Sequence, residues 1–140
     1  MNPLTVYIAA RGEDQALAAL CRALLAPYGI GSTARWIDQS LVNESHDEAQ
    51  MDLDDVRAAD ALVVLKPRSS HGKTTGGHHV ETGVALERGI PIILLGEAEN
   101  VFHQHRQVTV CGWPIVHLAS LAATIRHAIE TAQAAREVAS

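Results

Sequence analysis

Two hydrophobic patterns alternate along this chain of 140 residues. Short, nearly continuous apolar runs indicate buried strands, and longer segments with an apolar residue every three or four positions indicate amphipathic helices. The first pattern predicts five strands, at 4–10, 32–37, 61–66, 90–96 and 107–111. The second predicts four helices, at 13–29, 45–59, 78–89 and 117–138.

This alternation of strand and helix is typical of a parallel sheet with helices on both faces. We therefore expect an α/β fold: one domain over 1–140, a flavodoxin-like (Rossmann-like) three-layer sandwich around a five-stranded parallel sheet. Ligands of such folds bind at the carboxyl ends of the strands. The polar segments that follow the predicted strands should then build the site, and they lie at 10–12, 36–38, 66–77 and 96–105.

Charge and composition narrow the function classes. The net charge of −5 argues against a protein that binds a nucleic-acid backbone. No apolar run approaches the ~18–20 residues of a membrane span, and the first residues lack the basic start of a signal peptide. Cys21 and Cys111 are far apart, which predicts two buried free thiols in a reducing compartment. We expect a cytoplasmic protein with no membrane partner.

The loop at 67–77 is rich in glycine, serine and threonine and contains GKT at 72–74. A phosphate-binding P-loop would need glycine where this chain has Pro67, so we do not expect an ATPase. Backbone N–H groups ahead of a helix can still hold an anion. The candidates for such a cradle are Lys73, Thr74, Thr75, Gly76 and Gly77, and the alternative is an ordinary surface loop.

Five histidines fall in the two loops at the predicted edge of the site, namely His71, His78, His79, His103 and His105. Adjacent histidines on a helix point about 100° apart and seldom share an ion. The spacing from His103 to His105 is a weak metal signal. We therefore expect polar loop histidines, no metal site and no cofactor.

Two acids are candidates for chemistry. Glu81 is expected in the first turn of the helix over 78–89, where the helix dipole would lower its pKa and keep it ionised for nucleophilic attack. The alternative is a plain surface charge. Asp52 lies on the margin of an apolar stripe, as a half-buried proton donor would, whereas Asp54 points away and Asp55 lies to the side. Asp60, at the helix end, is expected to be structural.

Asp52 and Glu81 each lie in a longer sequence motif. MDLDDVRAADALVVL, at 51–65, carries Asp52, and GGHHVETGVALERGIPIILLG, at 76–96, carries Glu81. A YIA first strand and ENVFH at 99–103 accompany them. Over nearly its whole length the sequence resembles nucleoside 2-deoxyribosyltransferases and their relatives, the deoxynucleotide N-hydrolases. Ile90 departs from the lysine that is usual at the start of this family's strand.

The resemblance implies roles for individual residues. Glu81 aligns with the nucleophile that attacks the anomeric carbon, and Asp52 with the acid that assists the departing base. Tyr7 falls where the family often has a tyrosine near its site. Thr75 stands where transferases often have aspartate and nucleotide hydrolases have serine, which together with Arg11 favours a phosphorylated substrate.

Further residues complete the expected binding site. Gly76, Gly77 and His78 lie at the helix start, and Trp36 either stacks on a base or packs in the core. The resemblance also implies a homo-oligomer, because Asn100 and His103 stand where a neighbouring subunit often completes the site.

The expected enzyme cleaves the N-glycosidic bond of a (deoxy)nucleoside or its 5′-monophosphate through a glycosyl-enzyme intermediate on Glu81. Transfer to a second base and release to water both stay open, as does a strict hydrolase. A non-catalytic nucleotide sensor is the alternative from another class. The partner is a small nucleoside or nucleotide in each case.

Overall fold

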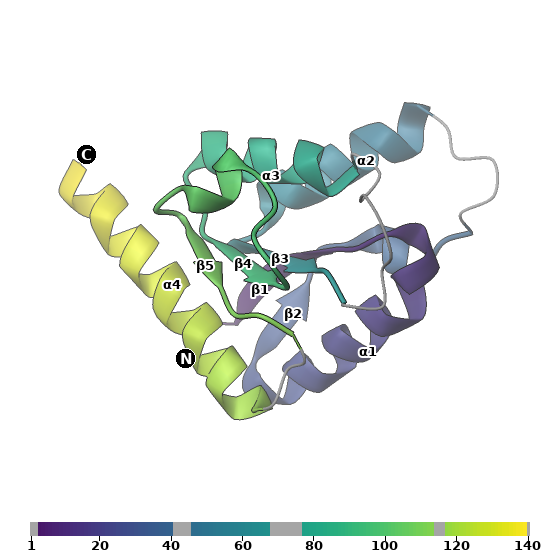
Figure 1. The fold of residues 1–140 in the computed structure, drawn as a ribbon, viewed down its shortest axis with the longest axis horizontal. Coiled ribbons are helices and arrows are strands. Elements are labelled where there is room, and N and C mark those ends of the chain that lie inside the picture. Colours follow the sequence, from purple (N-terminus) through teal and green to yellow (C-terminus); the bar gives the residue numbers. More distant parts are fainter. Residues whose placement is uncertain (1–2, 41–45, 68–76, 114–116, 140) are drawn as a thin grey trace.

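The structure is a computed structural model and describes residues 3–40, 46–67, 77–113 and 117–139. Its strands form one parallel sheet in the order β2-β1-β3-β4-β5, which confirms the expected flavodoxin-like topology (Figure 1). The strands are β1 (Leu4–Ala9), β2 (Ile30–Ser32), β3 (Ala61–Leu65), β4 (Ile92–Leu95) and β5 (Val108–Val110). β1 and β3 are neighbours at the centre of the sheet, where the strand order reverses direction and where ligands of this topology bind.

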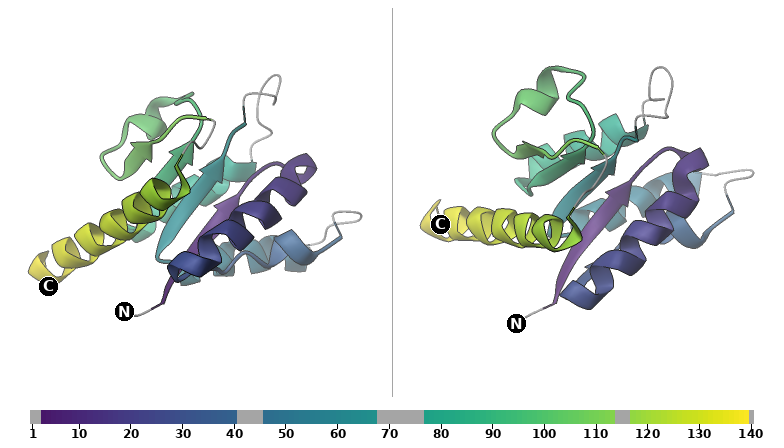
Figure 2. Two further views of the ribbon diagram at one scale, coloured as in Figure 1. Left: turned by 90° about the horizontal axis from the view of Figure 1, so that it is seen from below. Right: turned by 60° about the horizontal axis from the view of Figure 1, so that its bottom comes forward.

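The helices cover the sheet on both faces and make three layers (Figures 1 and 2). They are α1 (Gln15–Leu25), α2 (His46–Ala58), α3 (Gly77–Arg88) and α4 (Leu118–Ala139). α2 packs beside α3 above the sheet in Figure 1, and α1 and α4 lie below it. β3 is buried along its whole length, as expected of a central strand covered on both sides. Within the described part of the chain, no helix is both long and apolar enough to cross a membrane.

The second strand is the main error of the sequence prediction. The strand expected at 32–37 is only Ile30–Ser32, and Arg35–Asp38 is a short 3₁₀ helix, η3. The chain turns here because polar side chains take over its backbone donors. Ser32 Oγ accepts from the N–H of Ala34, and a carboxylate oxygen of Asp55 accepts from the N–H of Arg35.

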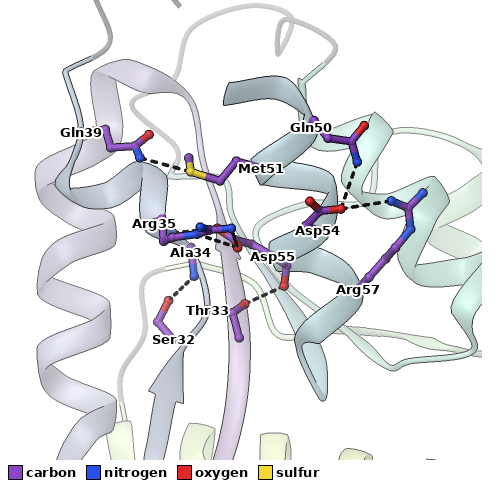
Figure 3. Close-up of polar contacts among 10 residues, drawn as sticks. All are labelled: Ser32, Thr33, Ala34, Arg35, Gln39, Gln50, Met51, Asp54, Asp55 and Arg57. Atoms are coloured by element: carbon purple, nitrogen blue, oxygen red, sulfur yellow. Dashed lines mark hydrogen bonds and ion pairs between the residues drawn. The ribbon is translucent and has the colours of Figure 1, made fainter. Parts of the chain in front are cut away.

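The same contacts correct the prediction for helix α2. Asp55 does not lie off to the side: it is buried, and it pairs with Arg35 at 2.8 Å (Figure 3). Its backbone carbonyl also accepts a hydrogen bond from the hydroxyl of Thr33. Asp54 points to solvent, as expected. The face of α2 that meets η3 is therefore anchored by an ion pair as well as by apolar residues.

Two smaller features join neighbouring strands of the sheet. Asp60 is structural, as predicted, because one of its carboxylate oxygens accepts from the N–H and the hydroxyl of Thr5. Gly96 follows β4 and packs against the backbone just after β3, since a Cβ there would lie 2.7 Å from the carbonyl oxygen of Lys66. Both cysteines are free, but only Cys21 is buried, so the prediction of a buried thiol is wrong for Cys111.

Candidate active site

A tyrosine and a glutamate meet above the carboxyl ends of the central strands. Tyr7 comes from β1 and is 1% exposed, and Glu81 comes from the second turn of α3. The Tyr7 hydroxyl donates to Glu81 Oε1 over 3.4 Å. Burial and the nearby charge of Glu81 raise the pKa of Tyr7, so its hydroxyl stays protonated and acts as a donor.

From the sequence, Glu81 is expected to be ionised, but its surroundings in the structure favour the protonated form instead. Burial, followed by the charge of Asp52, raises the pKa of Glu81 to about 8, and the hydrogen bond from Tyr7 offsets only part of that rise. α3 begins at Gly77, so Glu81 stands beyond the first turn, where a helix dipole has most effect. The carboxyl is therefore mostly protonated at neutral pH.

Asp52 lies close enough to both partners for its charge to act on them. It stands on α2 and is half-buried, as the helical pattern predicts. Its charge raises the pKa of Glu81 and that of Tyr7. Three different elements thus supply one group of interacting side chains: β1 supplies Tyr7, α2 supplies Asp52 and α3 supplies Glu81. This arrangement agrees with two carboxyls lining a common site.

A second polar group surrounds Glu99, which the sequence prediction missed. Its Oε1 lies 3.0 Å from His78 Nε2 and 3.3 Å from His79 Nε2. Its Oε2 lies 3.1 Å from the ammonium of Lys66. The adjacent histidines thus converge, with ring centroids 4.0 Å apart, and the expectation that they diverge is wrong. His78 is buried, and this lowers its pKa to about 4.

Asn100 and His103 organise the segment after β4. Asn100 Oδ1 caps the 3₁₀ helix η4 (Val101–Gln104) by accepting from the N–H groups of Phe102 and His103. Its amide nitrogen lies 3.3 Å from His79 Nδ1. His103 is buried, and its Nδ1 accepts from the N–H of Glu99. Both residues therefore hold the Glu99 group, and completion of the site by a neighbouring subunit stays a prediction.

Two predicted binding residues are engaged within the protein. Trp36 is buried and its indole N–H donates to the carbonyl of Ile8 over 2.8 Å, which agrees with the core-packing alternative. Arg11 pairs with Glu13 at 3.0 Å and with Asp14 at 3.2 Å, so local acids already balance its charge. A substrate contact by either side chain stays a prediction.

The remaining predicted residues belong to the loop before α3. Gly77 is the first residue of α3. Thr75, Gly76, Lys73 and Thr74 lie outside the described residues, as does His71. A sequence signal for the missed Glu99 did exist, because it directly precedes Asn100 in a polar segment that follows a buried strand. What the sequence could not show is that this segment folds back onto the start of α3.

Comparisons with known proteins bear on the fold. Models of known protein families and curated protein sequences give no match. Among solved structures, the chain is similar to the CMP N-glycosidase BcmB of Clostridium botulinum, with a TM-score of 0.58 and 19% sequence identity. The similarity covers 87% of this chain and 98% of that one. The chain therefore shares the fold of that enzyme over almost its whole length.

Proposed function

We propose that this protein is an N-glycosidase that cleaves the bond between base and sugar in a nucleoside or a nucleoside 5′-monophosphate. The observation that carries the proposal is the group of Tyr7, Asp52 and Glu81, with the Tyr7 hydroxyl 3.4 Å from Glu81 Oε1. Two interacting carboxyls in different surroundings suit acid and nucleophilic work on a glycosidic bond. The likeness in fold to a CMP N-glycosidase supports the same reaction class.

The raised pKa of Glu81 supplies the proton that the reaction needs. Before substrate binds, the carboxyl of Glu81 holds a proton. As substrate binds, this proton passes by way of Asp52 to the departing base, and the Glu81 carboxylate attacks the anomeric carbon. The C–N bond breaks, a C–O ester bond forms on Glu81, and the base leaves with the proton.

The second step restores the enzyme. A water molecule attacks the same carbon, the ester bond breaks, and Glu81 regains a proton as the free sugar or sugar phosphate leaves. A second base in place of water would give a new nucleoside by the same route. Whenever Glu81 is ionised, Tyr7 donates to its carboxylate and stabilises that form, and the raised pKa of Tyr7 keeps the hydroxyl protonated as the donor.

The test is a panel of nucleosides and 5′-monophosphates, incubated with and without a second base and separated by chromatography. Free base shows hydrolysis, and a new nucleoside shows transfer. Binding without either product would overturn the enzyme proposal and favour a nucleotide sensor. If a product forms, single-turnover samples should contain protein heavier by the mass of the glycosyl group, which is the sugar or sugar phosphate less one water.

Site variants connect the activity to this group. Glu81→Gln should lower the rate of base release at least about 10³-fold, as loss of a nucleophile does in other enzymes. Glu87→Gln is the matched control, because Glu87 is an exposed acid on the same helix. Full turnover by Glu81→Gln would exclude the mechanism.

A further inference from the structure

Outside the proposed catalytic group, one cluster of side chains is unexplained. His78 and His79 at the start of α3 face Glu99 and His103 from the segment after β4, and one possible ligand atom from each lies within 4.8 Å of all the others. Imidazole nitrogens and carboxylate oxygens are the usual ligands of zinc and related ions. His78 and His103 are buried, and Glu99 is an exposed residue whose side chain is 28% accessible.

The distances within this cluster select three of the four residues. His78 Nε2 and His79 Nε2 lie 3.0 and 3.3 Å from the same oxygen, Glu99 Oε1. Ligand atoms held at about 2.0–2.1 Å in a tetrahedral zinc site are about 3.3 Å apart. Without an ion, the same distances fit hydrogen bonds from the two imidazole rings to the Glu99 carboxylate. Only small movements would let one cation replace the two ring protons.

His103, the fourth residue of the cluster, is not one of the proposed metal ligands. Its Nδ1 accepts from the N–H of Glu99 over 3.0 Å, which places the proton of the neutral ring on Nε2. That nitrogen cannot bind a metal while it carries a proton, so His103 is a positioning residue that fixes the Glu99 backbone. Its buried Nε2 has no hydrogen-bond partner among the described residues. A water or anion held on an ion would give this N–H an acceptor.

The surroundings also suit an ion. The Lys66 ammonium binds the second oxygen of Glu99 at 3.1 Å and leaves Oε1 turned to the two histidines. A cavity of about 200 Å³, lined by His79, Asn100 and Phe102 among others, reaches the cluster and offers a way in. We propose that His78 Nε2, His79 Nε2 and Glu99 Oε1 bind a divalent transition-metal ion of the zinc class, with a fourth position left for water. The ion would fasten the first turn of α3 to the segment after β4.

The contact between His79 and Asn100 should weaken metal binding, and it therefore provides a test of the site. Metal binding through Nε2 moves the proton of His79 to Nδ1, which lies 3.3 Å from the amide nitrogen of Asn100. Two donors would then face each other. Asn100→Asp replaces the amide with an acceptor for that proton and keeps an oxygen for the cap of η4. It should therefore bind zinc about tenfold more tightly than the wild type.

The experiment titrates untagged, chelator-treated protein of full length with Zn²⁺ in a calorimeter and uses the visible absorption of Co²⁺ as a second probe. We expect one ion per chain and a zinc-dependent rise in Tm, with no such rise from Mg²⁺. Glu99→Gln should weaken Zn²⁺ binding at least about tenfold, and His127→Ala, an exposed histidine on α4, should not.

Two results would overturn the metal site. One is the absence of saturable one-to-one Zn²⁺ binding in the wild type. The other is an affinity that Glu99→Gln and Asn100→Asp both leave unchanged. If Glu99→Gln fails to fold, Asn100→Asp and the Co²⁺ spectrum still decide the question. None of these readouts uses catalysis, so the proposed N-glycosidase activity stands or falls separately.

Discussion

Tyr7 and Glu81 are 74 residues apart in the sequence, and the hydroxyl of one lies 3.4 Å from a carboxylate oxygen of the other. The central strand β1 supplies the tyrosine, and α3 brings the glutamate over the end of that strand. The Tyr7 hydrogen bond opposes the rise in the pKa of Glu81 that burial causes. Tyr7 thus favours the ionised carboxylate that must attack the sugar.

Tyr7→Phe should slow base release about tenfold to a hundredfold, because it removes a donor from the carboxylate but leaves the ring in the core. The measurement is kcat and KM on whichever nucleoside or nucleotide the wild type cleaves. We expect the loss in kcat rather than in KM, with unchanged far-UV circular dichroism. An unaltered kcat would remove Tyr7 from the mechanism.

The stability of the protein should fall with rising pH because of Glu81. Its pKa is about 8 in the folded protein, against an ordinary value of 4.5. Between these values the folded state binds more protons than the unfolded chain, so the free energy of unfolding decreases as pH rises. The stabilising effect is complete below about pH 4.5 and is lost as pH passes through about 8, with a total on the order of 3–5 kcal/mol.

Glu81→Gln tests this directly, because glutamine has the same shape and does not titrate. Urea unfolding of both proteins at several pH values from 5 to 9, with chelator present, should give a steeper decline for the wild type. Glu81→Gln should be the more stable protein at pH 9. Parallel pH profiles for the two would contradict the raised pKa.

The sheet was predictable because its signals are local and strong. The fully apolar run of β3 and the helices between strands dictate a parallel order, and the strand order β2-β1-β3-β4-β5 follows from that class of fold. Their motifs singled out Asp52 and Glu81 as candidates, and the structure brings the two close enough for the charge of Asp52 to act on Glu81. The protonation of Glu81 was not predictable, because it depends on burial under residues far away in the sequence.

Other errors have the same origin. The strand expected at 32–37 shortens because Asp55, 20 residues after Arg35, binds that residue's backbone and side chain. The convergence of His78 and His79 on Glu99 needs a folded segment 20 residues further on. Helical angles describe one helix in isolation, and they cannot show what a distant loop brings against it.

The Arg35–Asp55 pair should stabilise the docking of α2 on η3. Asp55 is buried and accepts from the Arg35 backbone and guanidinium (Figure 3). Asp55→Asn should lower the free energy of unfolding by about 1–2 kcal/mol, since it removes the charge of a buried acceptor whose partner, the Arg35 side chain, is 60% exposed. Asp54→Asn is the matched control on the same helix. Its partner Arg57 lies 3.7 Å away in solvent, so we expect a change under about 0.5 kcal/mol.

A substitution of Trp36 can distinguish a role in core packing from a role in substrate binding. Its ring is buried and its indole N–H donates to the Ile8 carbonyl, so Trp36→Phe should remove that hydrogen bond and some apolar contact. We expect the free energy of unfolding to fall by about 1–3 kcal/mol, while KM for the cleaved nucleotide changes less than twofold. Urea unfolding and steady-state kinetics on the same preparation measure both. A tenfold rise in KM with unchanged stability would instead mean that the indole stacks on the base, as the sequence allowed.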